Sequence, residues 1–101
     1  MKSGYNVVWT DNAVEELSKT IKYLQENFTE KEIQRLAQKV DRVIDLISRN
    51  PLVFPKSKVK PIHRFVILKY NTMYYQVSDD RIEILSFFSN RQSPEKNPFE
   101  E

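Results

Sequence analysis

Two amphipathic helix patterns follow one another in this sequence with almost no linker between them. In residues 11–27 apolar side chains recur at steps of three and four, the spacing of one helix face. These positions are Val14, Leu17, Ile21, Leu24 and, just beyond, Phe28. A second stripe of this spacing comprises Ile33, Leu36, Ala37, Val40, Val43, Ile44 and Ile47. Two helices joined by one or two residues pack as an antiparallel hairpin, so we expect a helical hairpin.

Capping residues mark the ends of both predicted helices. Thr10 and Asn12 stand at the start of the first helix, as N-cap residues commonly do. The run Thr29–Glu32 matches a capping box, so we expect the threonine side chain to accept a hydrogen bond from a helix amide. The pair Asn50-Pro51 ends the second helix, because proline disfavours helical geometry in the residue before it.

Short segments rich in β-branched and aromatic residues predict four strands, one before the helices and three after them. We expect these strands at residues 4–9, 62–69, 72–78 and 81–88. Asn71 and the pair Asp79-Asp80 have the chemistry of tight turns between the last three strands. The proline-containing stretch 50–61 and the C-terminal tail 89–101 are expected to be irregular.

The order strand, helix, helix, strand, strand, strand predicts a single α+β domain over residues 1–101, with the helical hairpin packed on one face of a mostly antiparallel four-stranded sheet. Strand alternation assigns to the helix side Met73, Tyr75, Val77, Ile82 and Ile84. It assigns to the opposite side Arg64, Val66, Leu68, Thr72, Tyr74, Gln76, Arg81, Glu83, Leu85 and Phe87. Because two helices cover only one face, we expect the second face to contact another macromolecule.

The residue types that the chain lacks exclude several kinds of site. It has no cysteine, one histidine and one glycine, which excludes disulfides, thiolate metal sites, cysteine nucleophiles and glycine-rich phosphate loops. We therefore expect no metal site and no small-molecule cofactor. The sequence shows no signal-like apolar run and no segment of membrane-spanning length, so we expect a cytoplasmic protein without membrane contact.

Basic residues gather in one short stretch that contains no acidic residue. Its members are Lys56, Lys58, Lys60, His63 and Arg64. With a net charge of +2, this stretch is either a footprint for an acidic partner or nucleic acid, or a solvated lysine-rich loop. His63 beside Arg64 could be a general base next to a phosphate-binding cation, although a lone histidine at a strand start is more often structural. Arg64, Arg81 and Arg91 could each hold phosphate or carboxylate, or be ordinary surface residues.

Several segments, in their order and spacing, resemble toxins of the RelE/ParE superfamily. They are Trp9-Thr10, Asn50-Pro51, His63–Tyr70, Met73–Val77, Asp79–Leu85 and Asn90–Gln92. The resemblance spans nearly the whole chain. It implies the toxin component of a type II toxin-antitoxin system, also called a plasmid stabilization system, which inhibits growth and is neutralised by a cognate antitoxin.

The resemblance leaves two mechanisms open. RelE-like members cleave mRNA on the ribosome, which would make this chain a metal-independent endoribonuclease with His63, Arg64 and Arg91 as catalytic residues. ParE-like members are associated with inhibition of DNA gyrase. RelE-like enzymes usually carry an arginine where this chain has Thr72, and a tyrosine or histidine near the C-terminus, where this tail offers Phe99. These departures favour a ParE-like toxin that binds its target, with a non-toxic partner-binding relative as a further alternative.

Partner binding is expected on the second sheet face and its rim. The residues that we expect to contact the target or the antitoxin are Arg64, Val66, Tyr74, Gln76, Arg81, Leu85, Phe87 and Arg91. The target would be DNA gyrase or, in the alternative, the ribosome with its mRNA. The tail 89–101 competes with the antitoxin as a cover for the apolar part of this face.

Overall fold

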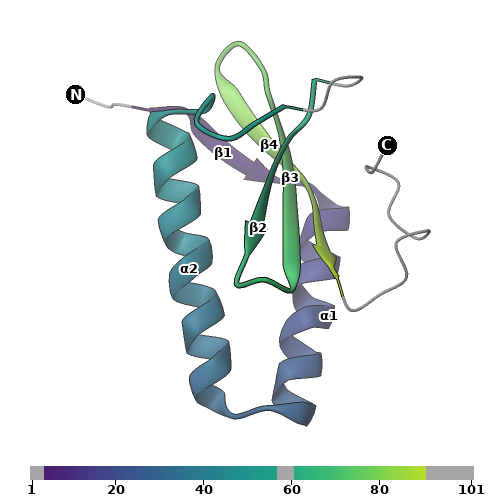
Figure 1. Ribbon diagram of the computed structural model, residues 1–101. Coiled ribbons are helices and arrows are strands. Elements are labelled where there is room, and N and C mark those ends of the chain that lie inside the picture. The colour runs from purple at the N-terminus through teal and green to yellow at the C-terminus, as the bar shows by residue number, and fades with distance from the viewer. Residues whose placement is uncertain (1–3, 57–60, 91–101) are drawn as a thin grey trace.

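The computed structural model describes residues 4–56 and 61–90. Its elements follow the predicted order (Figure 1). They are strand β1 (Asn6–Trp9), helices α1 (Asp11–Asn27) and α2 (Glu30–Arg49), and strands β2 (His63–Ile67), β3 (Asn71–Val77) and β4 (Arg81–Ser89). The predicted α+β fold is confirmed. β4 takes up Ser89, the first residue of the tail predicted to be irregular, and residues 91–101 of that tail lie outside the described residues.

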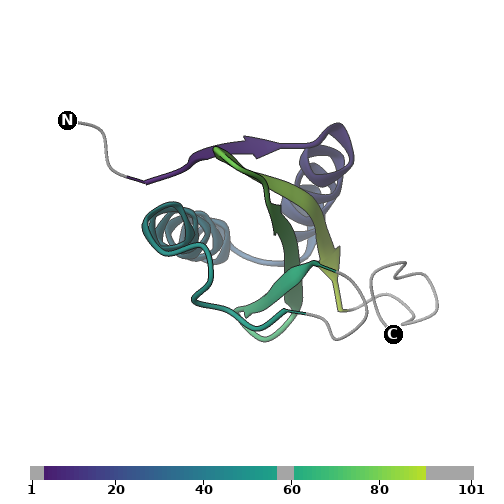
Figure 2. The same cartoon turned by 90° about the horizontal axis from the view of Figure 1, so that it is seen from above.

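The sheet has the strand order β1-β4-β3-β2. The hairpins β2–β3 and β3–β4 are antiparallel, whereas β1 pairs with β4 in parallel, so the sheet is mostly antiparallel as predicted. Seen from above, the sheet curves around α2 (Figure 2). The two helices run antiparallel, joined by Phe28 and Thr29 alone (Figure 1).

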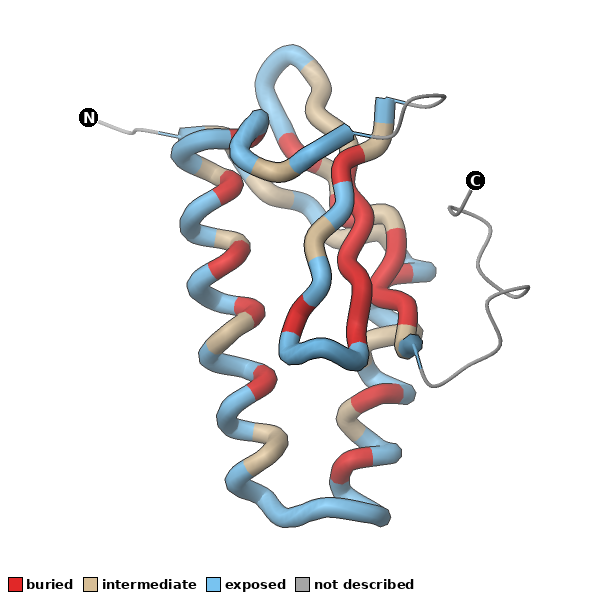
Figure 3. The backbone as a smooth tube through the Cα atoms, viewed as in Figure 1, coloured by how far each residue is buried: buried red, intermediate tan, exposed pale blue. Residues whose placement is uncertain are grey.

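The core lies between the helices and one face of the sheet (Figure 3). The strand residues predicted for the helix side belong to it: Met73, Tyr75, Ile82 and Ile84 are fully buried, and Val77 packs against them. Two members of the first helical stripe do not, since Val14 is 49% and Phe28 46% exposed. Ala13 takes the core position in the first turn of α1, and Phe28 lies past the end of the helix, where its periodicity no longer applies.

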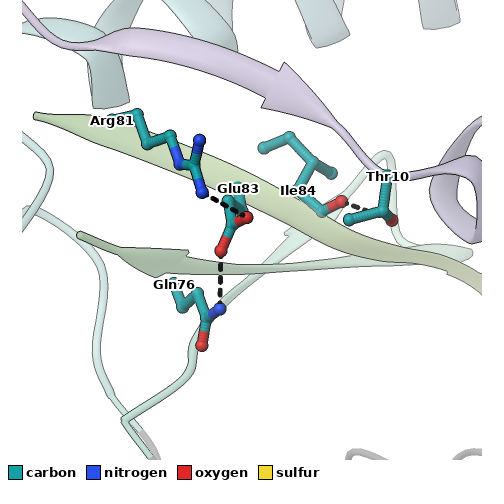
Figure 4. Close-up of polar contacts among 5 residues, drawn as sticks. All are labelled: Thr10, Gln76, Arg81, Glu83 and Ile84. Atoms are coloured by element: carbon teal, nitrogen blue, oxygen red, sulfur yellow. Dashed lines mark hydrogen bonds and ion pairs between the residues drawn. The ribbon is translucent and has the colours of Figure 1, made fainter.

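The first turn of α1 continues the pairing of β4 beyond the end of β1. The Thr10 hydroxyl donates to the Ile84 carbonyl at 2.8 Å (Figure 4). It also accepts from the Ala13 amide at 3.2 Å, so one side chain caps the helix and links it to the sheet. Glu16 Oε1 accepts from the Phe87 amide at 3.0 Å and from the Ser86 hydroxyl at 2.6 Å. These side chains form hydrogen bonds with the part of β4 that extends beyond β1 and has no neighbouring strand on that edge.

A β-bulge in β4 corrects one face assignment. Tyr75 pairs with Ile84 and Tyr74 with Ser86, so Leu85 is an extra residue on its strand. The bulge reverses the alternation after Leu85 and turns Phe87, predicted for the outer side, into the core. Continuing a strict period of two through this strand was wrong.

The β2–β3 turn also differs from the prediction. It consists of residues 68–70, and Asn71 is the first residue of β3, paired with Ile67, rather than a turn residue. Leu68 and Lys69 adopt φ angles of 51° and 74°, a left-handed conformation that costs roughly 1 kcal/mol or more for each residue that is not glycine. At the start of α2, Thr29 precedes the helix as predicted. Among the described residues, however, its side chain caps no helix amide, and the Glu32 amide donates to the Thr29 carbonyl instead.

Candidate functional site

His63 and Arg64 are neighbours on β2 but lie on opposite sides of the sheet. His63 is buried on the helix side, where it contacts Tyr75, and Arg64 is exposed on the other side. Strand geometry imposes this separation, because successive side chains point to opposite faces. The histidine and the arginine therefore cannot act on one substrate group. Arg91, the third residue of the predicted catalytic set, lies outside the described residues.

The contacts of His63 are those of a structural residue. Its Nδ1 lies 2.8 Å from the Phe54 carbonyl oxygen, so this nitrogen carries the hydrogen and donates. Its ring stacks on Tyr75 with centroids 4.9 Å apart, and the Tyr75 hydroxyl donates to the Pro51 carbonyl at 2.9 Å. Burial raises the pKa of Tyr75 to about 12. Together these contacts hold the segment after α2, which includes Pro51 and Phe54, against the sheet.

We call the side of β2, β3 and β4 that points away from the helices the outer face. Near one end of it, Glu83 joins two of the residues predicted to bind a partner (Figure 4). Gln76 Nε2 donates to Glu83 Oε1 at 2.7 Å, and Arg81 Nη2 lies 3.4 Å from Glu83 Oε2. The carboxylate pairs with Arg81, so this end of the face carries both charges beside the Gln76 amide.

The middle of the outer face is less open than predicted. Tyr74, which lies on β3 between its ladder partners Arg64 and Ser86, is buried. Thr72 is also buried, and its hydroxyl donates to Asn90 Oδ1 at 3.0 Å. The accessible part of the face is formed by Arg64 and Val66 on β2 and by the polar group around Glu83.

The remaining predicted residues are spread over several places. Leu85 is half-buried at the bulge, and its carbonyl accepts from Asn12. Of the basic stretch, Lys56 is exposed and pairs with His63 in an isolated β-bridge. Lys58 and Lys60 lie outside the described residues. The structure therefore brings Gln76 and Arg81 together, and places Phe87 in the core, away from any partner.

A groove that the sequence patterns did not indicate lies between the tip of the helical hairpin and the β2–β3 turn. In Figure 1 the two helices extend past this turn, at the bottom of the view. The groove has a volume of about 440 Å³. Its lining combines apolar, charged and amide groups: Leu24, Phe28, Glu32, Arg35, Leu36, Leu68, Lys69, Tyr70 and Asn71. The available signals were Phe28, an aromatic residue just past a helix end, and a tight turn without glycine.

A second, smaller hollow lies between the two helices of the hairpin. It has a volume of about 160 Å³ and is lined mainly by aliphatic side chains from both helices. No helix in the described part of the chain is long and apolar enough to cross a lipid bilayer.

Comparison with solved structures shows that this fold occurs in toxins. A protein of the chromosomal ParDE toxin-antitoxin system from P. aeruginosa superimposes with a TM-score of 0.70 at 12% identity, covering 84% of this chain and 95% of that one. A YoeB/ParE toxin from Agrobacterium tumefaciens gives 0.59 at 16% identity, with 83% and 96% covered. A chain of a YoeB-YefM complex from Staphylococcus aureus gives 0.54 at 21% identity, with 82% and 93% covered.

Comparison of sequences identifies the protein family, whereas comparison of structures identifies only the fold. No curated protein sequence matches this chain significantly. The family model of the ParE toxin of type II toxin-antitoxin systems, parDE, matches residues 7–94, which include every helix and strand described above except Asn6, the first residue of β1. This chain therefore belongs to the ParE toxin family of type II toxin-antitoxin systems.

Proposed function

We propose that this protein inhibits growth by binding a macromolecular target, DNA gyrase, and that a cognate antitoxin neutralises it. The observation that carries the binding mechanism is the separation of His63 from Arg64 across the sheet. General acid-base catalysis needs the proton-transferring group within hydrogen-bond reach of the reacting atoms. A buried histidine that donates to a main-chain carbonyl on the helix side does not meet that requirement.

Thr72 supports the same conclusion from the other side of the sheet. At the position where RelE-like enzymes usually place an arginine, this chain has a buried hydroxyl that is hydrogen-bonded to Asn90. Stabilising the transition state of RNA self-cleavage requires groups that offset the charge developing on the phosphate. A buried neutral hydroxyl supplies little of that charge, which favours binding over cleavage.

The antitoxin partner is supported by the family and by its structural neighbours. Among the similar structures are a protein of a ParDE system and a chain of a YoeB-YefM complex. The alternatives are a ribosome-dependent endoribonuclease, which would need Arg64 and Arg91, and a relative without toxicity. We expect all these activities in the cytoplasm.

Expression of the chain in bacteria tests the proposal. We expect growth arrest when it is expressed alone, recovery when its genetic neighbour is co-expressed, and the same arrest from a His63→Gln variant that folds. Normal growth at well-detected levels of folded protein would contradict toxicity. Loss of arrest in folded His63→Gln would contradict the binding mechanism and favour catalysis.

A further inference from the structure

The groove between the helical hairpin tip and the β2–β3 turn contains an unsatisfied buried acceptor. Asn71 lines the groove and is only 5% exposed. Its Nδ2 donates to the Ile67 carbonyl at 3.4 Å, whereas its Oδ1 accepts no hydrogen bond from any residue in the described part of the chain. Asn71 shares its strand face with Met73 and Tyr75, so its side chain points to the helix side, where the groove lies.

A buried amide oxygen without a donor is unfavourable, and a ligand that supplies an N–H group would remove that cost. A carboxylate or a phosphodiester cannot do this, because each offers only acceptors at neutral pH. The groove therefore favours a ligand with a donor at its inner end. The main-chain N–H of an extended peptide has this chemistry.

The walls of the groove are apolar and partly exposed to solvent. Phe28 and Leu68 are among the large exposed hydrophobic residues of the chain, and they line the groove together with the buried Leu24 and Leu36. Such a hollow suits one branched or aromatic side chain, which would bury apolar area on both sides. The peptide would thus insert one apolar anchor next to the N–H that reaches Asn71.

The charges of the groove favour an acidic neighbour of that anchor. Among the described residues, the charged groups that line it are Lys69, Arg35 and one carboxylate, Glu32, which lies 3.7 Å from Arg35 and is exposed to solvent like its partner. Two cations and one anion leave an excess positive charge, and the whole chain carries +2. An acidic residue beside the anchor would be attracted to Lys69 and Arg35.

We propose that this groove binds a short acidic-apolar segment of the antitoxin, with one main-chain N–H donated to Asn71 Oδ1 and one apolar side chain between Phe28 and Leu68. The assignment rests on the proposed function, because it presupposes an antitoxin. A flexible acidic segment that orders on binding can place a donor, an anchor and a carboxylate in one narrow site. The turn of residues 68–70, in which the Tyr70 amide donates to the Leu68 carbonyl, places Leu68 and Lys69 on the wall of the groove.

Binding of purified antitoxin, measured by calorimetry, tests the groove. We expect Leu68→Ser to weaken binding about tenfold or more, and Lys69→Glu to weaken it several-fold, with a loss that shrinks at high salt. The matched controls are Leu52→Ser, which removes a side chain that is 72% exposed and outside the groove, and Lys19→Glu on the exposed side of α1. We expect both controls to bind within about twofold of the wild type.

Growth assays separate this inference from the proposed function. We expect Leu68→Ser and Lys69→Glu to stay toxic when expressed alone but to be rescued poorly by the antitoxin. Unchanged antitoxin affinity in both folded variants would overturn the groove assignment and leave the proposed function standing. Variants that lose toxicity but keep antitoxin affinity would assign the groove to the target, and competition by a single-stranded oligonucleotide would assign it to nucleic acid. A wild-type protein that binds no antitoxin would refute both proposals.

Discussion

Tyr75 links the buried face of the sheet to the segment that follows α2. The ring packs in the core and against His63, while the hydroxyl reaches the Pro51 carbonyl. Desolvation keeps this hydroxyl protonated in the folded state to higher pH than in the unfolded chain. The residue therefore makes the stability of the protein depend on pH in a defined alkaline window.

We predict that the free energy of unfolding falls as the pH rises from 10 to 12. The unfolded tyrosine loses its proton near its ordinary pKa of 10.0, whereas folded Tyr75 retains it until about 12. In this window the unfolded state binds fewer protons, so raising the pH favours unfolding, by on the order of 2 kcal/mol over the whole range. Below pH 10 the contribution is fully present.

Urea titrations at pH 9, 10, 11 and 12 measure this effect against a Tyr75→Phe variant. The variant loses the bond to Pro51 and is less stable at pH 9, but its stability should fall less steeply above pH 10. Parallel declines in the two proteins would show that Tyr75 is not the group responsible.

Single residues also show where sequence reasoning stopped. The absence of cysteine and the single histidine limited the chemistry that we considered, and strand alternation could have placed His63 and Arg64 on opposite faces. The side that His63 would take, and its carbonyl partner Phe54, depend on how the segment after α2 folds back over β2. Asparagine is common in turns, so the sequence predicted a turn at Asn71. Its pairing with Ile67 in β3, and its place on the wall of the groove, are seen only in the structure.

At the scale of elements, the junction between α1 and β4 is the contact that no local pattern indicated. Glu16 lies 70 positions from Ser86 in sequence, yet one carboxylate oxygen accepts from the Ser86 hydroxyl and from the Phe87 amide. The helix periodicity places Glu16 on the solvent-exposed side of α1. The β-bulge at Leu85, which shapes the region that Glu16 binds, cannot be predicted from the alternation of a regular strand. The helices, by contrast, were predictable to within a residue, because their periodicity and caps are local.

We predict that Glu16→Ala lowers the free energy of unfolding by about 2 kcal/mol, since it leaves two donors on β4 without their acceptor. This corresponds to a fall in melting temperature on the order of 10 °C for a domain of this size. Glu16→Gln keeps an acceptor oxygen and should lose less. Glu15→Ala removes the adjacent exposed carboxylate and should change stability by under about 0.5 kcal/mol. Equal effects of Glu15→Ala and Glu16→Ala in thermal unfolding would argue against the junction.

At the scale of the whole molecule, the order of elements determined the fold class, because a helical hairpin and a three-stranded meander have few ways to pack. The place of β1 next to β4, the closed middle of the outer face and the groove at the hairpin tip required the three-dimensional structure. Long-range packing sets each of these features. The membership in the ParE toxin family agrees with the resemblance seen in the sequence.

At the same scale, the placement of the charged and titratable residues is consistent with our proposal that the toxin acts by binding. Its candidate acid-base residue is buried on one side of the sheet, and the accessible part of the other side offers Arg64, Val66 and a polar group in which Arg81 is paired with Glu83. Such a surface can recognise a protein without carrying out chemistry on it.

Supercoiling of relaxed plasmid DNA by purified gyrase, with and without this protein, tests that claim most directly. We predict inhibition that increases with toxin concentration, that persists in His63→Gln, and that disappears when purified antitoxin is added in equimolar amount. Full supercoiling activity in the presence of excess folded toxin would contradict the account.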